Sequence, residues 1–267
     1  MSATHPGSAV RIQALCKSYP DAAGAPVIAL RDATLSVHPG ELFGIAGGAG
    51  AGKTTLLRQL LRLDPPDSGT VSVAGVDLAT LTPGELRAAR RTTGVVFPQP
   101  HLLQHASVYD NVALPLHFAG TLNAPRLAAR VNECLDLVGL ASLADAAPAQ
   151  LNAAQQRRLA LARALAGRPG LLLYDEPAGG ADSLAALADI LHSVNVRFGT
   201  TIVVASRSAQ LLGALCTRVA VLERGELAEQ FAPATTQVPP RTALGRELAY
   251  HASEGVLHPA WDGFAHV

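Results

Sequence analysis

The segment 44–55, Gly-Ile-Ala-Gly-Gly-Ala-Gly-Ala-Gly-Lys-Thr-Thr, holds the residues best suited to chemistry in this sequence. Its Gly-x-x-x-x-Gly-Lys-Thr spacing is typical of a loop whose successive backbone N–H groups curl around a phosphate. Lys53 would add a point charge for the β- and γ-phosphates, and Thr54 would offer its hydroxyl to Mg²⁺. The predicted phosphate-binding residues are Gly47, Gly48, Ala49, Gly50, Ala51, Gly52, Lys53, Thr54 and Thr55.

The residues on either side predict the two elements that would hold this loop. Leu42–Ala46 is a short apolar run typical of a buried strand, and Lys53–Leu63 places four leucines on one helical face. The alternative, a glycine-rich turn that matches by chance, would not need a strand before it and a helix after it. The helix N-terminus would also direct partial positive charge at the same phosphates.

A second group of polar residues follows another apolar strand. Leu171–Tyr174 ends in Asp175 and Glu176. Beside a phosphate loop, Asp175 can hold Mg²⁺ through water, and Glu176 can polarise an attacking water. Strands and helices alternate along the chain, which indicates a mainly parallel sheet covered on both faces. Because such strands share one carboxyl edge, we expect Gly47 and Asp175 to meet there.

The remaining elements are predicted from periodicity and turn residues. Strands are expected at 10–15, 27–37, 94–97 and 200–205, and hairpins at 70–76 and 219–230. Helices are expected at 82–91, where Thr82 and Glu85 have capping-box spacing, and at 126–138, 155–165 and 183–198.

Composition excludes several classes of protein. The 267 residues carry 21 basic and 21 acidic side chains, which argues against a nucleic-acid partner held by bulk charge. Mean hydropathy is +0.24, but no run of apolar residues approaches the length of a membrane span. We expect no secretion signal, and the three dispersed cysteines are typical of buried side chains in a reducing cytoplasm.

Taken together, the motifs over residues 8–232 resemble the ATP-binding subunits of ABC transporters. The order of motifs is phosphate loop, hairpin, helical insert, Leu151–Gln155, Arg163–Leu165, Asp175–Glu176 and Asp182. The resemblance implies an α/β P-loop NTPase fold with a mainly parallel sheet, antiparallel β hairpins and a helical subdomain at about 98–165. Residues 233–267 would form a C-terminal tail. The stretches 84–91, 111–116 and 225–227 look most like the methionine-importer branch.

The resemblance assigns roles to three further residues. In such proteins two subunits face each other head to tail, and each ATP lies between one phosphate loop and the partner's signature motif. Tyr19 would stack on adenine, and Asp182 would cross the subunit interface. Gln99 lies next to the position of the glutamine that links the nucleotide to the membrane partner. The alternatives are a core aromatic at a strand end, a helix N-cap and a loop amide, respectively.

The signature motif departs from the family. Its usual sequence is Leu-Ser-Gly-Gly-Gln, and residues 151–155 are Leu-Asn-Ala-Ala-Gln. The backbone N–H groups remain, and the Asn side chain can still reach a phosphate, but two added methyl groups would hinder the partner's close approach. The signature residues expected to bind nucleotide are Asn152, Ala153, Ala154 and Gln155.

Two other positions differ. In Phe97-Pro98-Gln99-Pro100, proline occupies the usual glutamine position and Gln99 is displaced by one residue. After the strand at 200–205 the family carries a catalytic histidine, and this chain has Arg207. Arginine keeps a donor for the γ-phosphate but stays charged, and it can pair with Glu176, the expected catalytic base.

The resemblance implies an ATP- and Mg²⁺-dependent ATPase subunit of a bacterial ABC importer for methionine or a related amino acid. It would lie peripherally on the cytoplasmic face of the inner membrane. Its partners would be an integral membrane permease, a second ATP-binding subunit as homodimer or heterodimer, and indirectly a periplasmic binding protein. One alternative is a degenerate subunit that binds ATP as a switch with little hydrolysis. Another is a soluble ABC ATPase without transport, against which Gln99 and Asn111–Leu116 weigh, because that region docks membrane helices in the family.

Overall fold

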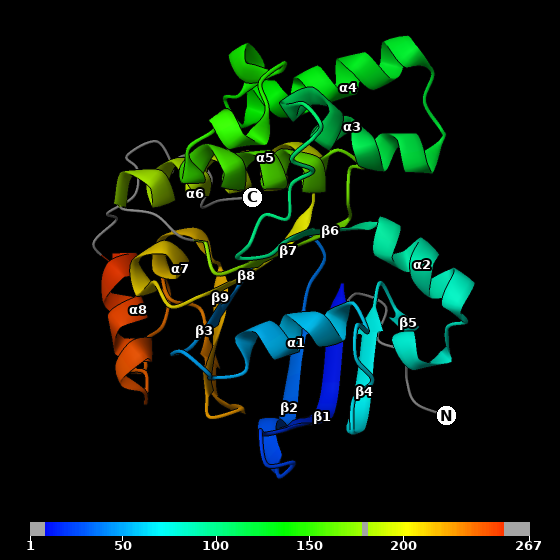
Figure 1. The fold of residues 1–267 in the computed structure, drawn as a ribbon. Helices are drawn as coiled ribbons and strands as arrows, with labels where there is room; N and C mark the ends of the chain where they lie inside the picture. Colours follow the sequence, from blue (N-terminus) through cyan, green and yellow to red (C-terminus); the bar gives the residue numbers. More distant parts are fainter. Residues whose placement is uncertain (1–8, 178–180, 254–267) are drawn as a thin grey trace.

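The computed structural model describes residues 9–177 and 181–253, except the side chains of residues 181–183. In this part of the chain a six-stranded sheet is covered on both faces (Figure 1). One helix and a smaller sheet pack on one face, and further helices cover the other. The buried side chains accordingly form two apolar clusters, one on each face of the larger sheet.

The larger sheet has six strands and is mainly parallel, as the sequence predicted. Its spatial order is β10 (Glu226–Phe231), β9 (Arg218–Glu223), β3 (Leu42–Ala46), β8 (Thr201–Ser206), β7 (Leu171–Asp175) and β6 (Thr93–Val96). Only β10 runs antiparallel to its neighbour, in the hairpin with β9.

Strand β7 shows why these strands are apolar throughout. Leu172 and Tyr174 join the cluster under the covering helices, whereas Leu171 and Leu173 join the cluster on the opposite face. Because both faces are covered, successive side chains are all buried and no polar alternation is possible.

The smaller sheet is antiparallel and packs on the second face. Its order is β2 (Pro26–Val37), β1 (Val10–Pro20), β4 (Ser68–Val73) and β5 (Val76–Asp77). The predicted end of the first strand at residue 15 was wrong, because pairing with β2 continues to Pro20. Register shifts after Ile12 and Leu15, with Ala14 at φ 48°, absorb the break in the apolar pattern.

Helix α1 (Lys53–Leu60) follows the phosphate loop and packs between the larger and the smaller sheet. Leu56, Leu57 and Leu60 are at most 3% exposed, so the predicted apolar face is confirmed. The helix ends three residues earlier than predicted, because Arg62 adopts a left-handed conformation at φ 46°. Its guanidinium then donates to the carbonyl of Leu78, the first residue of the short helix η1 (Leu78–Thr80), and to that of Leu81, which follows the helix.

Helix α2 (Pro83–Arg91) begins with the predicted capping box between Thr82 and Glu85. Between β6 and β7 the chain is helical and contains no strand, as predicted. The helices there are α3 (Val108–Ala119), α4 (Ala124–Leu137), η2 (Ala141–Leu143), η3 (Pro148–Gln150) and α5 (Ala153–Leu165), at the top of Figure 1. The sequence did not identify α3, which contains Pro115 but begins with a Ser107–Asp110 capping box.

Two of the remaining helices were also not predicted. They are α7 (Ala209–Leu215) and α8 (Ala243–Ser253), which pack on each other, whereas α6 (Ala181–Phe198) was expected from residue 183. Leu248 of α8 is fully buried. A Cβ added at Gly213 of α7 would lie 2.8 Å from the Leu248 carbonyl oxygen, so the two helices are in close contact. The segment expected to be a tail therefore contains a docked helix. No helix in the described residues has the length and apolar character needed to cross a bilayer.

Candidate nucleotide-binding site

The parallel register of the larger sheet brings the predicted chemical groups to one edge. Ala46 of β3 pairs with Ser206 of β8, and Asp175 of β7 pairs with Ala205. The phosphate loop follows β3, Asp175 ends β7 and is followed by Glu176, and Arg207 follows β8. The carboxyl edge of the sheet is therefore where the candidate site lies.

The loop between β3 and α1 needs glycine at two positions, because neighbouring backbone leaves no room there for a side chain. A Cβ at Gly47 would lie 2.5 Å from the Leu222 carbonyl oxygen, and one at Gly52 would lie 2.4 Å from that of Ala29. Gly52 also has φ 104°, which side-chain-bearing residues rarely adopt. These two glycines let the loop lie directly against β9 and β2.

The middle of the loop is open. A Cβ at Gly48 or Gly50 would meet no atom within 4 Å, and residues 48–50, including Ala49, are exposed. Ala51 is buried, and its carbonyl accepts a hydrogen bond from the N–H of Gly225 in the terminal hairpin. The loop is thus anchored at both ends and presents its central backbone outward, which suits an anion cradle.

Lys53 lies under this loop with its ammonium group almost fully buried. The side chain is 4% exposed, and Nζ donates to the carbonyl oxygens of Gly47 at 2.8 Å and Gly48 at 2.9 Å. Nζ also lies 2.9 Å from Oε1 of Glu176. The cation and the expected catalytic carboxylate are therefore direct neighbours.

Thr54 and Asp175 form the second contact across the edge. The Thr54 hydroxyl donates to Oδ2 of Asp175 at 2.7 Å. Asp175 is fully buried, and burial raises the pKa of its carboxyl group, although the Thr54 hydrogen bond and nearby Lys53 oppose the rise. The other oxygen, Oδ1, is buried without a hydrogen-bond partner.

This unpaired oxygen tests whether the site suits Mg²⁺. Leaving a buried carboxylate oxygen unpaired is costly, and a hard divalent cation with its waters would satisfy it. The neighbouring Thr54 hydroxyl is a further oxygen ligand of the kind that Mg²⁺ accepts. The donor set therefore fits the ion.

Glu176 turns away from the strand end in a strained conformation. Its φ is 45°, and its N–H donates to the carbonyl of Ala205 at 2.8 Å. Besides Lys53 on Oε1, the carboxylate has Arg207 on Oε2, with Nε at 3.5 Å. Arg207 is 67% exposed, so its pairing is the weaker of the two.

Tyr19 stands at the far end of β1, beside α1. Its hydroxyl donates to Asp64 at 3.2 Å, and burial together with that carboxylate raises the pKa of the phenol. The ammonium of Lys17 lies 5.2 Å from the centre of the ring, and Arg58 holds Asp64 at 3.1 Å. The sequence gave no indication of Asp64, because the contact joins residues far apart in the chain.

The other predicted site residues do not contact this cluster. Gln99 is exposed on the loop after β6. Asn152 and Gln155 form a capping box at the start of α5, with Ala153 and Ala154 in its first turn. Among the described residues, no hydrogen bond or ion pair links either segment to Lys53 or Asp175. The side chain of Asp182 lies outside the described residues.

Fold and site together define a P-loop nucleotide-binding protein of the α/β class. Comparison with known families identifies the class more narrowly: the family described as ABC transporter matches residues 30–179. The chain belongs to the ABC transporter family, with the fold of its ATP-binding cassettes.

Individual relatives agree with this family assignment. The methionine import ATP-binding protein MetN of Cupriavidus metallidurans is 44% identical over 222 residues, covering 82% of this chain and 64% of the relative. The same protein of Cupriavidus pinatubonensis is 40% identical over 255 residues, covering 93% and 74%. A dimeric ATP-binding cassette solved in a post-hydrolysis state with ADP and phosphate is 30% identical, has a TM-score of 0.78, and is matched over 84% of this chain and 98% of its own. The chain spans less than two-thirds of the length of the first relative.

Proposed function

We propose that this chain binds Mg²⁺-ATP and hydrolyses it as the ATPase subunit of an importer. The observation that carries the proposal is the convergence of Lys53, Thr54, Asp175 and Glu176 at one sheet edge, with an unpaired buried oxygen on Asp175. When bound, Mg²⁺-ATP would supply the γ-phosphoryl group as electrophile and a cation that neutralises its charge.

Each residue has a task that its position supports. The open backbone at Gly48 and Gly50 and the buried Lys53 would hold the phosphates, and Thr54 with Asp175 would hold Mg²⁺. Glu176 would accept hydrogen bonds from the attacking water, once its carboxylate is no longer shared with Lys53. Because Lys53 cannot serve a phosphate and Glu176 fully at once, nucleotide binding and activation of the base are coupled.

A second subunit would complete the site. The signature residues Asn152–Gln155 lie at the exposed start of α5, and among the described residues they make no hydrogen bond or ion pair to this chain's own Lys53 or Asp175. The related cassette was solved as a dimer, which supports a head-to-tail arrangement for this chain as well. Tyr19, already oriented by Asp64, would stack on the adenine.

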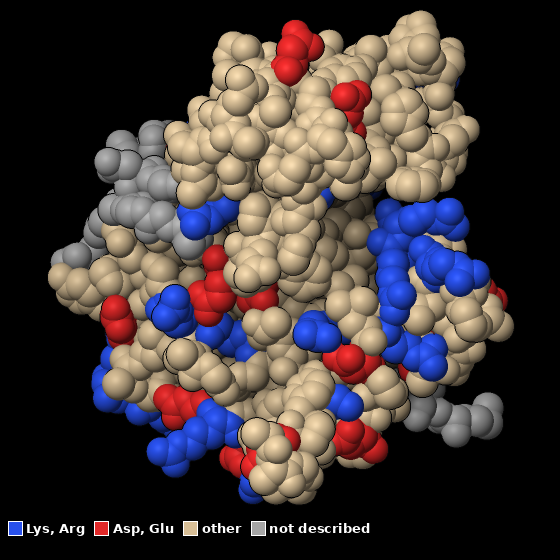
Figure 2. Space-filling model, viewed as in Figure 1, with Lys and Arg blue, Asp and Glu red and all other residues tan. Residues whose placement is uncertain are grey.

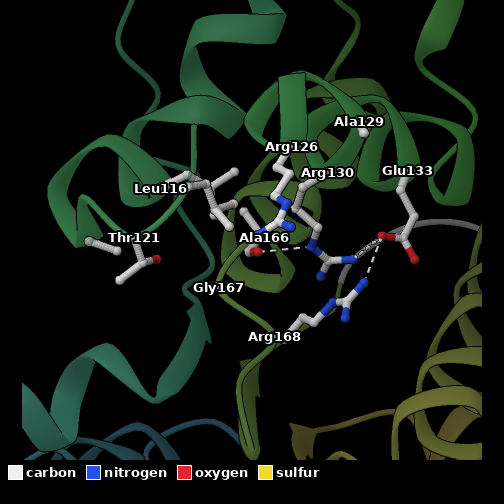
Figure 3. A pocket seen from close by; sticks show the side chains of 11 residues that line it. Leu116, Thr121, Arg126, Ala129, Arg130, Glu133, Ala166, Gly167 and Arg168 are labelled. Carbon is white, nitrogen blue, oxygen red and sulfur yellow. Dashed lines mark hydrogen bonds and ion pairs between the residues drawn. The ribbon is translucent and has the colours of Figure 1, made fainter. Parts of the chain in front are cut away.

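The membrane partner would dock on the helical region. A cavity of about 430 Å³ lies among α3, α4 and the loop after α5, with an apolar side formed by Leu116 and Leu122. Figure 3 shows Arg126 and Arg130 reaching into it from α4, with Glu133 pairing Arg130 at 2.6 Å and Arg168 at 3.3 Å. With Arg126, Arg130 and Arg168 set against one acidic residue, the cavity favours a segment that carries carboxylates.

Nearby features extend this surface. Phe118 is 75% exposed at the end of α3, and Figure 2 shows basic side chains gathered over α2. The end of α2 is adjacent to the cavity, because a Cβ at Gly167 would lie 3.8 Å from the Arg91 carbonyl oxygen. By contrast, Asn111–Ala113, expected within the docking region, is buried.

Methionine or a related amino acid is the proposed cargo, because the relatives in both Cupriavidus species carry that name. As part of the same proposal, the chain would lie on the cytoplasmic face of the inner membrane, and a periplasmic binding protein would deliver the cargo. Uptake of labelled methionine by cells expressing this chain with its permease, and its loss in Glu176→Gln, would support the assignment. Equal uptake in Glu176→Gln would contradict it.

Nucleotide binding is tested by Lys53→Ala. We expect loss of Mg²⁺-ATP binding, measured with a fluorescent analogue, because the buried ammonium is the loop's only side-chain cation. Arg31→Ala, which removes an exposed pair with Glu226, is the control and should bind normally. Unchanged affinity in Lys53→Ala would remove the basis of the proposal.

Docking is tested by co-purification with the permease subunit of the proposed importer. Arg126→Glu should abolish co-purification because it removes the excess of positive charge in the cavity. Arg246→Glu, on α8, makes the same charge change elsewhere and should have no effect. Retention of the permease by Arg126→Glu would place the docking surface elsewhere.

A second candidate function is a subunit that binds ATP with little hydrolysis. One observation favours it: Glu176 is held by two cations at once, one of them Arg207 in the position of the family histidine. Turnover of the purified wild-type protein separates the two, since a degenerate subunit would bind the analogue normally but release little phosphate.

A further inference from the structure

The loop that follows β6 has few hydrogen bonds of its own. Pro98 and Pro100 lack N–H donors, Gln99 between them is exposed, and His101 has φ 44°. The next part of the loop is held by Asn111 of α3, whose side chain accepts from the N–H of Leu103 and donates to its carbonyl. This leaves residues 98–101 to be held by other means.

Arg163 of α5 supplies the missing contacts. Its guanidinium donates to the carbonyl of Pro100 at 2.7 Å and to that of His101 at 2.9 Å. Within residues 9–177 and 181–253, no other hydrogen bond reaches residues 98–101. Two donors from one planar group, bound to two successive carbonyls, fix orientation as well as distance.

The side chain that makes these bonds is itself well fixed. Arg163 is partly buried, and burial lowers the pKa of its guanidinium, which nevertheless remains charged. The adjacent Ala164 anchors the helix against β6, because a Cβ at Gly94 would lie 2.7 Å from its carbonyl oxygen. Helix α5 therefore cannot shift along its axis without moving the Gln99 loop.

The other end of the same helix carries the signature motif. The Asn152–Gln155 capping box begins α5, and Arg163 lies in its last turn. A single helix thus connects the segment offered to the second subunit with the loop that carries Gln99.

We infer that Arg163 is a positioning residue for ATP hydrolysis, which couples the placement of Gln99 to the placement of the signature motif through α5. The inference rests on the proposed function, because it needs Gln99 to act in turnover. Arg163 does not touch the nucleotide in this scheme, so its loss should change kcat more than KM.

The test is a double-mutant cycle on the purified full chain. Arg163→Met keeps most of the side-chain volume and removes both bonds. We expect kcat for ATP to fall about 10-fold with little change in KM, because small misplacements of catalytic groups cost up to about 100-fold in rate. On a Gln99→Ala background the same change should cost less than about 2-fold, since linked residues are not additive.

Arg158→Met is the matched control. Arg158 lies on the same helix and donates one hydrogen bond to the Val138 carbonyl at 3.2 Å, within the helical region only. It should leave kcat within about 2-fold of the wild type on both backgrounds. If Arg163→Met fails to fold, Arg163→Lys, which keeps the charge but not the planar fork, replaces it in the same cycle.

The outcomes distinguish failure of the Arg163 inference from failure of the proposed ATP hydrolysis. An equal fall in kcat on both backgrounds, or a fall matched by Arg158→Met, would overturn the role of Arg163. Absence of turnover in the wild type with normal nucleotide binding would instead contradict the proposed hydrolysis, and would leave no kcat for Arg163 to influence.

Discussion

Replacing Arg207 by histidine tests how the catalytic carboxylate is controlled. Glu176 has Lys53 at 2.9 Å on one oxygen and Arg207 at 3.5 Å on the other. The change Arg207→His removes the weaker, exposed partner and restores the residue usual in the family. If Arg207 only restrains Glu176, turnover should rise.

The structure limits how large the rise can be. Arg207 is 67% exposed, and ion pairs of this kind contribute about 0.2–1 kcal/mol. Releasing 1 kcal/mol changes a rate by about 5-fold at most. If instead Arg207 contacts the γ-phosphate and stabilises charge in the transition state, its loss would lower kcat by about 10³-fold or more.

Steady-state phosphate release at saturating Mg²⁺-ATP separates these outcomes. We expect kcat to rise by at most about 5-fold in Arg207→His. Arg31→His is the control, because Arg31 pairs with Glu226 at 3.4 Å with similar exposure. A fall of about 10-fold or more in Arg207→His alone would refute the restraint and make Arg207 a catalytic residue. Restoring the signature in the same protein (Asn152→Ser, Ala153→Gly, Ala154→Gly) should raise turnover further if the added methyl groups hinder the partner.

Three further changes test the structure around the site. Gly52→Ala should lower the free energy of unfolding by about 1–3 kcal/mol, because its Cβ would lie 2.4 Å from the Ala29 carbonyl at φ 104°. Urea unfolding would show this, and Gly48→Ala, where a Cβ meets nothing within 4 Å, should be nearly neutral. Burial raises the pKa of Asp175, so the folded state holds a proton more tightly than the unfolded chain, and stability falls as pH rises between the two pKa values. Asp175→Asn should therefore raise Tm near pH 7 by about 2–4 °C while Mg²⁺-dependent binding is lost, and an unchanged Tm would show that the charge is tolerated. Leu248→Ala should cost about 2–5 kcal/mol, whereas Tyr250→Ala, 56% exposed on the same helix, should cost far less. Equal effects of these two would mean that α8 contributes no buried core.

Local rules allowed much of the fold to be predicted from the sequence. The strand Leu42–Ala46, the glycine-rich loop and the leucine face of α1 are adjacent in the chain, so spacing alone was enough. The capping box at Thr82 and the β9–β10 hairpin are local in the same sense. The errors fall where tertiary contacts override local preference. β1 continues past its broken pattern because β2 pairs with it, and α8 forms where the sequence suggested only a tail.

Within the site, the sequence by itself determined the residue types: a lysine and a threonine after glycines, and two acids after an apolar strand. Only the tertiary structure decided their relations. Lys53 contacts Glu176, Thr54 contacts Asp175, and Arg163 holds the Gln99 loop; these contacts join residues 62 to 123 positions apart. The same packing leaves one oxygen of Asp175 buried and unpaired. Such contacts depend on how strands are ordered and registered in the sheet. That order is set by the burial of both sheet faces together, which no local stretch of sequence encodes.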